Sequence, residues 1–549
     1  MSPTEFPRVL ESVSGFLREL KAQLPDTEVR LIADGEDGVS MAIARAVVAL
    51  DVTVEVVVAP GSDSRGSADG ADVLRHPRVE RVEIAVDIVG RGTRAAKLAD
   101  ILLRRSSLLI ALWDGTASRE PDDTADVVFR FLETPIERGE TVDKIAVATA
   151  FDELDVSMRP VFWVPAPRAG AGPLESPPES RFILGADDNV LDVATSMPPS
   201  LKGRLADLNE FNRDFDRLKH ENRLAVTESL MSGLPPEITL RDCGILEEID
   251  RQYVKADSLA GYMQWRSDRL FNLFGFMAFT MGTAYLVYDK ITASRSLLIL
   301  YMLILFASLV AYYILQGRRW FGKHLSYRAL AETLRVRFYL SLAGIDRRIR
   351  TRQLIALTGI HRFPGFSWIG FVLDAIEPTI VEEPGAGDVY LRRARLVDEA
   401  WIENQYQYFA RKVARMESSG HKVKRLRFVM FVAVLAVIST MFIFGNSLQH
   451  VDAHTGLPMK NMITFCSGFL AVLLGVLELR RNKMATQELL WQYRSQLTQF
   501  QRARTQLKRI TSRIRRDDVL MDLGQTSLME IYLWAIHRYH REHAPPAGP

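Results

Sequence analysis

Nine residues in two glycine-containing turns have the side chains and the backbone freedom best suited to holding a ligand. They are Gly35, Glu36, Gly38 and Ser40 in "ADGEDGVSMAIA" (33–44), and Trp113, Asp114, Gly115, Asp123 and Thr124 in "LWDGTASREPDDTADVV" (112–128). Each turn follows an apolar run and precedes a helical pattern. Such a turn presents backbone N–H groups and the positive end of a helix, which suit a phosphate.

The two turns differ in how far their chemistry points to a ligand. In the first, the spacing is not G-x-G-x-x-G, and Asp34, Glu36 and Asp37 oppose an anion, so an ordinary strand-to-helix turn is the alternative. In the second, Asp114 can accept hydrogen bonds from ribose hydroxyls or base amino groups, and Trp113 can stack on a base. The alternative there is a core tryptophan followed by a turn aspartate.

Alternating strands and helices are expected to position these turns. The apolar runs "EVRLIA" (28–33), "VTVEVVVA" (52–59), "ERVEIAV" (80–86), "SLLIALWD" (107–114) and "RPVFWVPAP" (159–167) predict five strands, the last one ending the set. Helical patterns lie between them, which predicts a parallel sheet with helices on both faces. Ligands bind such sheets at the carboxyl ends of the strands.

After this α/β region, residues 165–180 form a stretch rich in proline and glycine that reads as an exposed loop or linker. Residues 200–223 then place leucine and phenylalanine at three- and four-residue intervals. This spacing predicts an amphipathic helix that packs on the preceding domain or on a partner.

Four apolar runs in the second half predict transmembrane helices. They are Leu270–Tyr288, Leu297–Leu315, Phe428–Gly445 and Met462–Leu479. At about 1.5 Å per residue each is about 27–29 Å long, close to the thickness of the hydrocarbon core. The alternative of buried helices in a soluble protein would require a very large core around them.

Basic residues at the ends of these runs predict the orientation. The predicted inner flanks contain Lys255, Arg266, Arg269, Arg318, Arg319, Lys323, Lys422, Lys424, Arg425, Arg427, Arg480, Arg481 and Lys483. The two connecting loops contain far fewer. The positive-inside rule therefore predicts a multi-pass protein of the inner (plasma) membrane with both termini in the cytoplasm.

The spans contain few polar residues. The candidates to line a pore are Asn272, Thr280, Thr283, Ser308, Ser439, Thr440, Thr464 and Ser467. Hydroxyls in membrane helices more often bond to their own backbone or to a neighbouring helix, which is the alternative for each. The two hairpins also resemble each other, because "SYRALAETL" (326–334) and "QYRSQLTQF" (492–500) follow their second spans at a common spacing of about 165 residues.

Composition limits the remaining classes of function. The 549 residues have a net charge of only +2, so nothing global points to a nucleic acid partner, and the two cysteines cannot form a disulfide framework. The N-terminus lacks the pattern of a cleaved signal peptide. No catalytic set and no histidine or cysteine spacing for a metal is found, and no cofactor is expected beyond a nucleotide-derived ligand.

Residues 28–165 resemble the SLOG superfamily, Rossmann-like domains that bind nucleotide-derived ligands in bacterial signalling and defence proteins. The matching residues are 33–35, the alanine-rich helix 42–50, the strand ending at Pro60, 112–115 and 124–128. The resemblance implies a nucleotide site at the two turns. The chain departs from the family at Asp122 and Asp123, where two glycines are usual.

The membrane half resembles SLATT domains, two-span units that occur beside SLOG domains and are proposed to form pores. The matching segment is "SYRALAETLRVRFYLSLAG" (326–344), with Arg328, Glu332 and Arg335 on a helix that leaves the second span. By this resemblance the helix is a stalk that couples ligand binding to the spans. A solvated helix with an ordinary ion pair is the alternative.

Together these patterns predict an α/β Rossmann-like cytoplasmic domain and an all-α membrane domain of two duplicated hairpins. The expected ranges are the α/β domain (1–165), a linker and amphipathic helix (166–250), the first hairpin (251–350), a cytoplasmic middle segment (351–410), the second hairpin (411–515), and a C-terminal helix and tail (516–549). The leading hypothesis is a homo-oligomeric channel gated by a nucleotide-type ligand. A membrane-anchored nucleotide-processing enzyme and a non-catalytic scaffold are the alternatives.

Overall fold

The structure is a computed structural model in which the chain divides into two compact units. It describes residues 5–58, 72–83, 94–115, 123–132, 146–149, 159–167, 179–187, 190–235, 243–316, 319–345, 363, 365–376, 388–444, 458–483 and 486–542. Unit 1 comprises Met1–Leu224, Pro236–Lys255 and Gly344–Pro384. Unit 2 comprises Ala225–Pro235, Ala256–Ala343 and Gly385–Pro549.

The first sheet of unit 1 agrees with the expected parallel arrangement. β1 (Arg30–Asp34), β2 (Thr53–Val58) and β3 (Val79–Glu83) lie in the order β1-β2-β3, and both pairs are parallel. β2 is the central strand, and Val54, Val56, Val57 and Val58 are buried. A strand buried on both faces reads as a nearly continuous apolar run, here interrupted by Glu55.

The second sheet corrects the prediction of a single parallel sheet. β4 (Leu109–Trp113), β5 (Ala146–Thr149), β6 (Val161–Pro165), β7 (Arg181–Asp187) and β8 (Val190–Ala194) lie in the order β4-β6-β7-β8-β5. β4–β6 and β5–β8 are parallel, but β7 is antiparallel to both β6 and β8.

The prediction that 159–167 is the last strand is therefore wrong. Only residues 188 and 189 separate β7 from β8. A connection this short can join only antiparallel neighbours, because a parallel pair needs a crossover of a dozen or more residues. The run "RFILGADDNVLDVA" (181–194), with polar residues between two apolar stretches, contained the signal for this hairpin.

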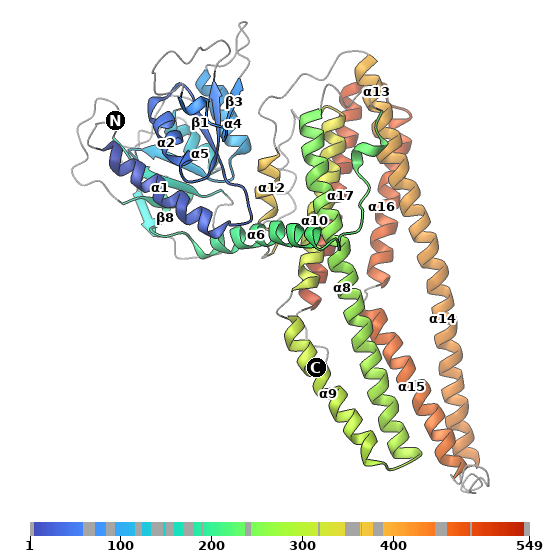
Figure 1. Cartoon of the computed structure of the whole chain (residues 1–549). Helices are drawn as coiled ribbons and strands as arrows, with labels where there is room; N and C mark the ends of the chain where they lie inside the picture. The colour runs from blue at the N-terminus through green and yellow to red at the C-terminus, as the bar shows by residue number, and fades with distance from the viewer. Residues whose placement is uncertain are drawn as a thin grey trace. The chain divides into compact units, whose positions relative to one another are not determined.

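Helices cover both faces of the sheets, as expected (Figure 1). On one face, residues of α1 (Phe6–Gln23), α2 (Gly38–Val48) and α6 (Pro199–His220) share a core with β2, β6 and β7. On the other face, α4 (Arg94–Arg105) and α5 (Thr124–Phe131) pack against β4, β6 and β7. The structure thus shows an α/β unit, and the amphipathic helix predicted at 200–223 packs on it.

Unit 1 also contains chain from both sides of the first hairpin. The start of α8 (Cys243–Lys290) and the short helix α12 (Ile369–Ala375) both pack near α6. The ring of Phe211 on α6 lies 5.0 Å from the ring of Trp368, and the Lys255 Nζ lies 4.8 Å from the same phenylalanine ring. One buried side chain of α6 therefore contacts both segments.

Unit 2 is helical. Its elements after α8 are α9 (Arg295–Gln316), α10 (Trp320–Leu342), α13 (Asp388–Leu396), the π-helix η4 (Val397–Glu403), α14 (Asn404–Phe444), α15 (Met459–Lys483), α16 (Thr486–Leu507) and α17 (Arg513–Glu542). Figure 1 shows α8 and α14 each as one continuous helix. At 48 and 41 residues they are about twice as long as a membrane crossing requires.

Four helices are long and apolar enough to cross a membrane, as predicted. They are α8, α9, α14 (with η4 and most of α13 before it) and α15. Within their apolar windows at most 6% of residues are buried inside the protein. Large apolar side chains such as Phe276, Phe306, Phe431 and Phe442 are exposed. In a bilayer these faces contact lipid, which costs nothing, whereas in water they would be a liability.

The first and fourth spans pack closely through glycines. A Cβ built on Gly282 of α8 would lie 2.8 Å from Cγ1 of Val472, and one built on Gly468 of α15 would lie 2.7 Å from a methyl of Leu286. The rings of Phe279 and Phe469 meet edge to face at 5.3 Å. Small residues allow such close approach, which is how membrane helices associate.

Candidate functional site

The first candidate turn is shaped by close packing against β2. The Gly35 N–H donates to the Val57 carbonyl at 2.9 Å, and a Cβ at position 35 would lie 2.6 Å from a methyl of Val58. The Glu36 N–H donates to the Asp34 carboxylate at 2.9 Å. Only glycine fits at position 35, whereas a Cβ at Gly38 would meet nothing within 4 Å.

The N-terminus of α2 already holds a carboxylate. Asp37 is the N-cap, and it accepts hydrogen bonds from the Ser40 N–H at 2.8 Å and the Ser40 hydroxyl at 2.7 Å. This is an ordinary cap, in which the carboxylate satisfies a backbone donor and neutralises the positive helix end. A phosphate at this turn would have to compete with Asp37 for the same donors.

The second candidate turn combines a buried tryptophan with a glycine whose φ is positive. Trp113 ends β4 and is only 3% exposed, with its ring 5.8 Å from that of Trp163 and 6.0 Å from that of Phe129. Gly115 has φ +83°, and a Cβ there would lie 3.0 Å from the Trp163 ring. The tryptophan thus forms core, the glycine allows the turn, and Asp114 between them is half-buried.

The remaining residues of this turn lie at the start of α5. Asp123 caps the helix by accepting from the Asp126 N–H at 2.9 Å, and Thr124 is exposed at the first helical position. Asp122 lies outside the described residues. Both candidate turns therefore end in an aspartate-capped helix, and their role in binding stays a prediction.

Two buried ion pairs in unit 1 were not foreseen. Glu55, in the middle of β2, is 1% exposed and forms an ion pair with Arg105 of α4. Arg159 is 3% exposed; it donates to the Leu103 carbonyl at 2.7 Å and lies 3.4 Å from the carboxylate of Asp374. A buried charge needs a partner, because an unpaired charge away from water is costly. The partner of Arg159 lies 215 residues away in the sequence, so no local pattern reveals it.

The predicted coupling residues form a network that is partly buried. Arg328 contacts both Asp257 of α8 and Glu332, each at 2.5 Å, and Arg335 contacts Glu332 at 2.6 Å. Burial raises the pKa of Glu332, but the guanidinium groups of Arg335 and Arg328 outweigh it and hold this pKa below its ordinary value. The alternative of a solvated helix is wrong, because most residues of α10 are buried in unit 2.

Neighbouring helices explain this burial. α10 packs against α17, with a hydrogen bond between the Thr333 and Tyr532 hydroxyls. The ring of Tyr339 stacks on that of Trp401 at 5.4 Å with an interplanar angle of 4°. α10 is therefore the centre of a helical bundle.

Most of the candidate pore residues use their hydroxyls locally. Thr280, Ser308, Thr440, Thr464 and Ser467 each donate to a carbonyl one turn earlier in their own helix, at 2.7–2.9 Å. The Thr283 hydroxyl is buried without a hydrogen-bond partner among the described residues, and Ser439 is exposed. This agrees with the alternative that such groups bond to their own backbone. Because these five hydroxyls are used in this way, they do not form a polar path through a single chain.

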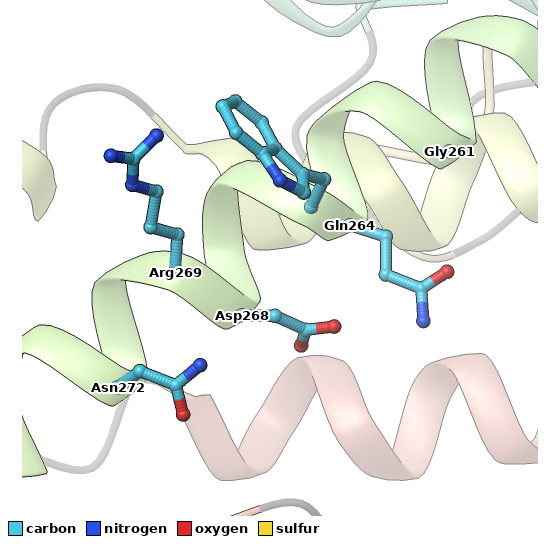
Figure 2. Close-up of a pocket in the computed structure, with 6 residues that line it drawn as sticks. Gly261, Gln264, Asp268, Arg269 and Asn272 are labelled. Carbon is cyan, nitrogen blue, oxygen red and sulfur yellow. The ribbon is translucent and has the colours of Figure 1, made fainter. Parts of the chain in front are cut away.

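Asn272 lies in a pocket on α8 (Figure 2). The pocket has a volume of about 370 Å³ and is lined by Gly261, Gln264, Trp265, Asp268, Arg269 and Asn272. It lies where the apolar run of the first span begins. Across the described parts of the chain, no cluster of three metal-ligating side chains is found.

Comparison with known proteins adds no assignment. No family model matches the chain, no curated protein is detectably similar, and no solved structure matches.

Proposed function

We propose that the protein is a ligand-gated membrane effector, in which an α/β unit senses a nucleotide-type ligand and controls an oligomeric transmembrane pore. The observation that carries this proposal is which segments of the chain make up unit 1. The unit contains the chain just before the first span and the chain that follows α10, in addition to the α/β layers. A change in the α/β unit on ligand binding therefore acts on both ends of the first hairpin through the chain itself.

Contacts within unit 1 support this route. Lys255 of α8 donates to Asn212 of α6 at 2.5 Å, and Ser107, two residues before β4, donates to Asp374 of α12 at 3.0 Å. Asp114 directly follows β4 at its other end. A ligand at Asp114 would thus act on an element tied to the segment between the hairpins. Differential affinity for two arrangements of this unit would supply the gating energy.

The pore requires more than one chain. The spans carry few polar groups, and most of their hydroxyls are satisfied within their own helices. A conducting path therefore has to form between copies, so we propose a homo-oligomer in the inner membrane. The basic flanks favour both termini in the cytoplasm, where the α/β unit meets nucleotides.

The two hairpins are proposed to be copies of one unit, and matching ion pairs support it. After the second span, Arg328 pairs with Asp257 on the helix that leads into the first span, at 2.5 Å. After the fourth span, Arg494 pairs with Glu417 on the helix that leads into the third, at 2.6 Å. Both arginines follow the tyrosine of the shared Tyr-Arg sequence. Together with the resemblance to SLOG and SLATT domains, this favours a sensor fused to two membrane units.

The decisive experiment is ion flux across liposomes that contain the purified full-length chain. Flux is measured with buffer, with a small-molecule nucleotide extract, and with a panel of pure NAD-type and cyclic nucleotides. We expect flux only with one class of nucleotide. No flux under any condition would overturn the channel proposal.

The same preparation tests the enzyme alternative. Chromatography of the nucleotide panel before and after incubation reports turnover. Turnover without flux would favour a membrane-anchored enzyme, with Glu36, Asp122 or Asp123 as the available bases. Neither flux nor turnover, and no ligand bound, would favour the scaffold.

A further inference from the structure

One face of α14 is exposed and changes from basic to apolar where the third span begins. It carries four exposed cations, spaced four, seven and three residues apart: Arg411, Arg415, Lys422 and Arg425. Residues at these intervals share one face of a helix. Four residues after Arg425 the same face continues with Val429, which is exposed at the start of the apolar run. The buried residues of α14, Val413 and Met430, do not belong to this series.

The carboxylates of the two helices of this hairpin are already paired. Glu417 is the only acidic residue of α14, and Glu478 is the only one of α15. The Glu417 carboxylate lies 2.6 Å from the guanidinium of Arg494, and the Glu478 carboxylate lies 3.3 Å from that of Arg427. Each acidic side chain therefore neutralises an arginine other than the cations of the exposed face.

Three cations next to the third span stay without a partner in the part of the chain that the structure describes. Lys422, Lys424 and Arg425 are all exposed, and none of them forms an ion pair or a side-chain hydrogen bond with another described residue. Lys422 and Arg425 are three residues apart and lie side by side on the exposed face. This end of the hairpin thus carries a concentrated positive charge that the described protein does not compensate.

The level of these cations along α14 is that of the lipid headgroups. The apolar run of the third span starts at Phe428, three residues after Arg425 and six after Lys422. At about 1.5 Å per residue their backbones lie about 5–9 Å outside the hydrocarbon, where the headgroup layer is about 5–8 Å thick. Lysine and arginine side chains are long enough to place their charged ends among the headgroups from there.

We propose that Lys422, Lys424 and Arg425 bind the phosphates of anionic phospholipids in the leaflet that borders this end of the third span. The guanidinium of Arg425 can donate to two phosphate oxygens, and the two lysines act as point charges. Val429, on the same face, then contacts the acyl chains of the lipid. The proposal depends on membrane insertion alone and not on gating, so it stands or falls apart from the proposed function.

The balance of charge selects an anionic lipid over a zwitterionic one. In a zwitterionic headgroup the phosphate is balanced by the lipid's own cation, and the carboxylates of Glu417 and Glu478 are engaged with arginines, so neither is free to receive that cation. An anionic headgroup brings an uncompensated negative charge to uncompensated positive ones. A second copy of the chain is a poor occupant of this face, because it would present the same cations.

The test measures which lipid lies against this face in the full-length protein. In a Cys243→Ser, Cys466→Ser background, Val429→Cys is labelled with a fluorophore, and the protein is placed in phosphatidylcholine bilayers. Increasing fractions of brominated phosphatidylglycerol or brominated phosphatidylcholine then quench the fluorophore on contact. A basic residue near the surface raises the affinity for anionic lipid about fivefold, so we expect phosphatidylglycerol to quench at a mole fraction about tenfold lower or less.

The triple variant Lys422→Gln, Lys424→Gln, Arg425→Gln should bring the two quenching curves together. The matched control, Arg502→Gln, Lys508→Gln, Arg509→Gln, removes three other exposed cations. These lie at least sixteen residues, about 24 Å, beyond the start of α16, so the control should keep the preference.

Thermal unfolding in detergent checks that both triple variants are folded, and 1 M salt should weaken the preference of the wild type by screening. Equal quenching by the two lipids with the basic residues present would overturn the proposal. An undiminished preference for phosphatidylglycerol in the variant that lacks Lys422, Lys424 and Arg425 would overturn it as well.

Discussion

At the scale of the residue, the two candidate turns show how one pattern can serve folding and binding together. Gly35 and Gly115 are required by the packing of β2 and of Trp163, and Asp37 and Asp123 are required as helix caps. Each of these would be selected without any ligand. Asp114 lies directly after β4, between a buried tryptophan and a glycine with positive φ, and it is the residue of these turns that we propose to contact the ligand.

Asp114→Ala is therefore expected to abolish the response to the nucleotide extract and leave membrane insertion intact. The lost hydrogen bonds should weaken binding about tenfold or more. Thermal stabilisation of the purified protein by the extract is the measurement. Asp72→Ala, which removes an exposed carboxylate of unit 1, is the control. Unchanged stabilisation in Asp114→Ala would move the site away from this turn.

A second residue-scale prediction concerns acid stability. Burial lowers the pKa of His324 to about 3, so the folded protein keeps the imidazole neutral, while the unfolded chain binds a proton near pH 6.5. The unfolded state then binds more protons between pH 6.5 and 3, so stability falls as pH falls through this window. His324→Gln can still donate to the Ala260 carbonyl and should flatten the dependence.

The measurement is thermal unfolding in detergent from pH 7 to pH 4. The wild type should lose stability over this range and the variant should lose less. If the wild type and His324→Gln lost stability equally over this pH range, His324 would not be the cause of the pH dependence. Glu332 adds a separate loss of stability in the same direction, which begins as pH falls through the ordinary carboxyl value of 4.5, because its pKa in the folded protein lies below that value.

At the scale of the element, the packing of α8 on α15 makes a sharp prediction. Gly282→Ala should destabilise the protein by about 1–3 kcal/mol, because the new methyl would lie 2.8 Å from Val472, a β-branched side chain that cannot turn away easily. Gly275→Ala on the same helix is the control, since its Cβ would lie 3.7 Å from Val476, an ordinary contact. Thermal unfolding in detergent compares them; equal stability of the two variants would refute the contact.

The short helix α12 gives a second element-scale prediction. Asp374→Asn leaves Arg159 buried without its charged partner, which should cost about 3 kcal/mol and loosen the segment from the α/β layers. Limited proteolysis of the full-length protein should then cut faster within residues 344–384. Cleavage at the wild-type rate would show that the ion pair does not hold this segment. Asp522→Asn, which changes an exposed carboxylate on α17, is the control.

At the scale of the whole molecule, the central prediction is association between copies. Cys466 is exposed on α15, within the fourth span. In a Cys243→Ser background, oxidation of membranes should yield disulfide-linked dimers through Cys466 if α15 lies at the interface between copies, and Cys466→Ser should yield none. If neither Cys466 nor a cysteine placed at the exposed Phe306 of α9 gives a cross-link, the oligomer is contradicted.

Local patterns in the sequence correctly predicted the four long apolar helices, the helix α6 (Pro199–His220), and five of the eight strands that the described residues form. Each of these depends on a local property: the length of an apolar run against the thickness of a bilayer, or a periodicity of side chains. The turns at 33–44 and 112–128 were found for the same reason. Their capping aspartates and tight glycines are signals read within a few residues.

Which of these side chains are buried, and which residues they contact, depends on packing between segments that are far apart in the chain. Trp113 is part of the core because Trp163 and Phe129 pack against it. Arg328 and Glu332 form a partly buried network because α17 and α8 pack against α10. The return of α12 to unit 1 also depends on such long-range contacts. Whether a side chain is buried, and with which group it pairs, depends on the residues that pack against it. Those residues are often far away in the sequence, so a local pattern does not reveal them.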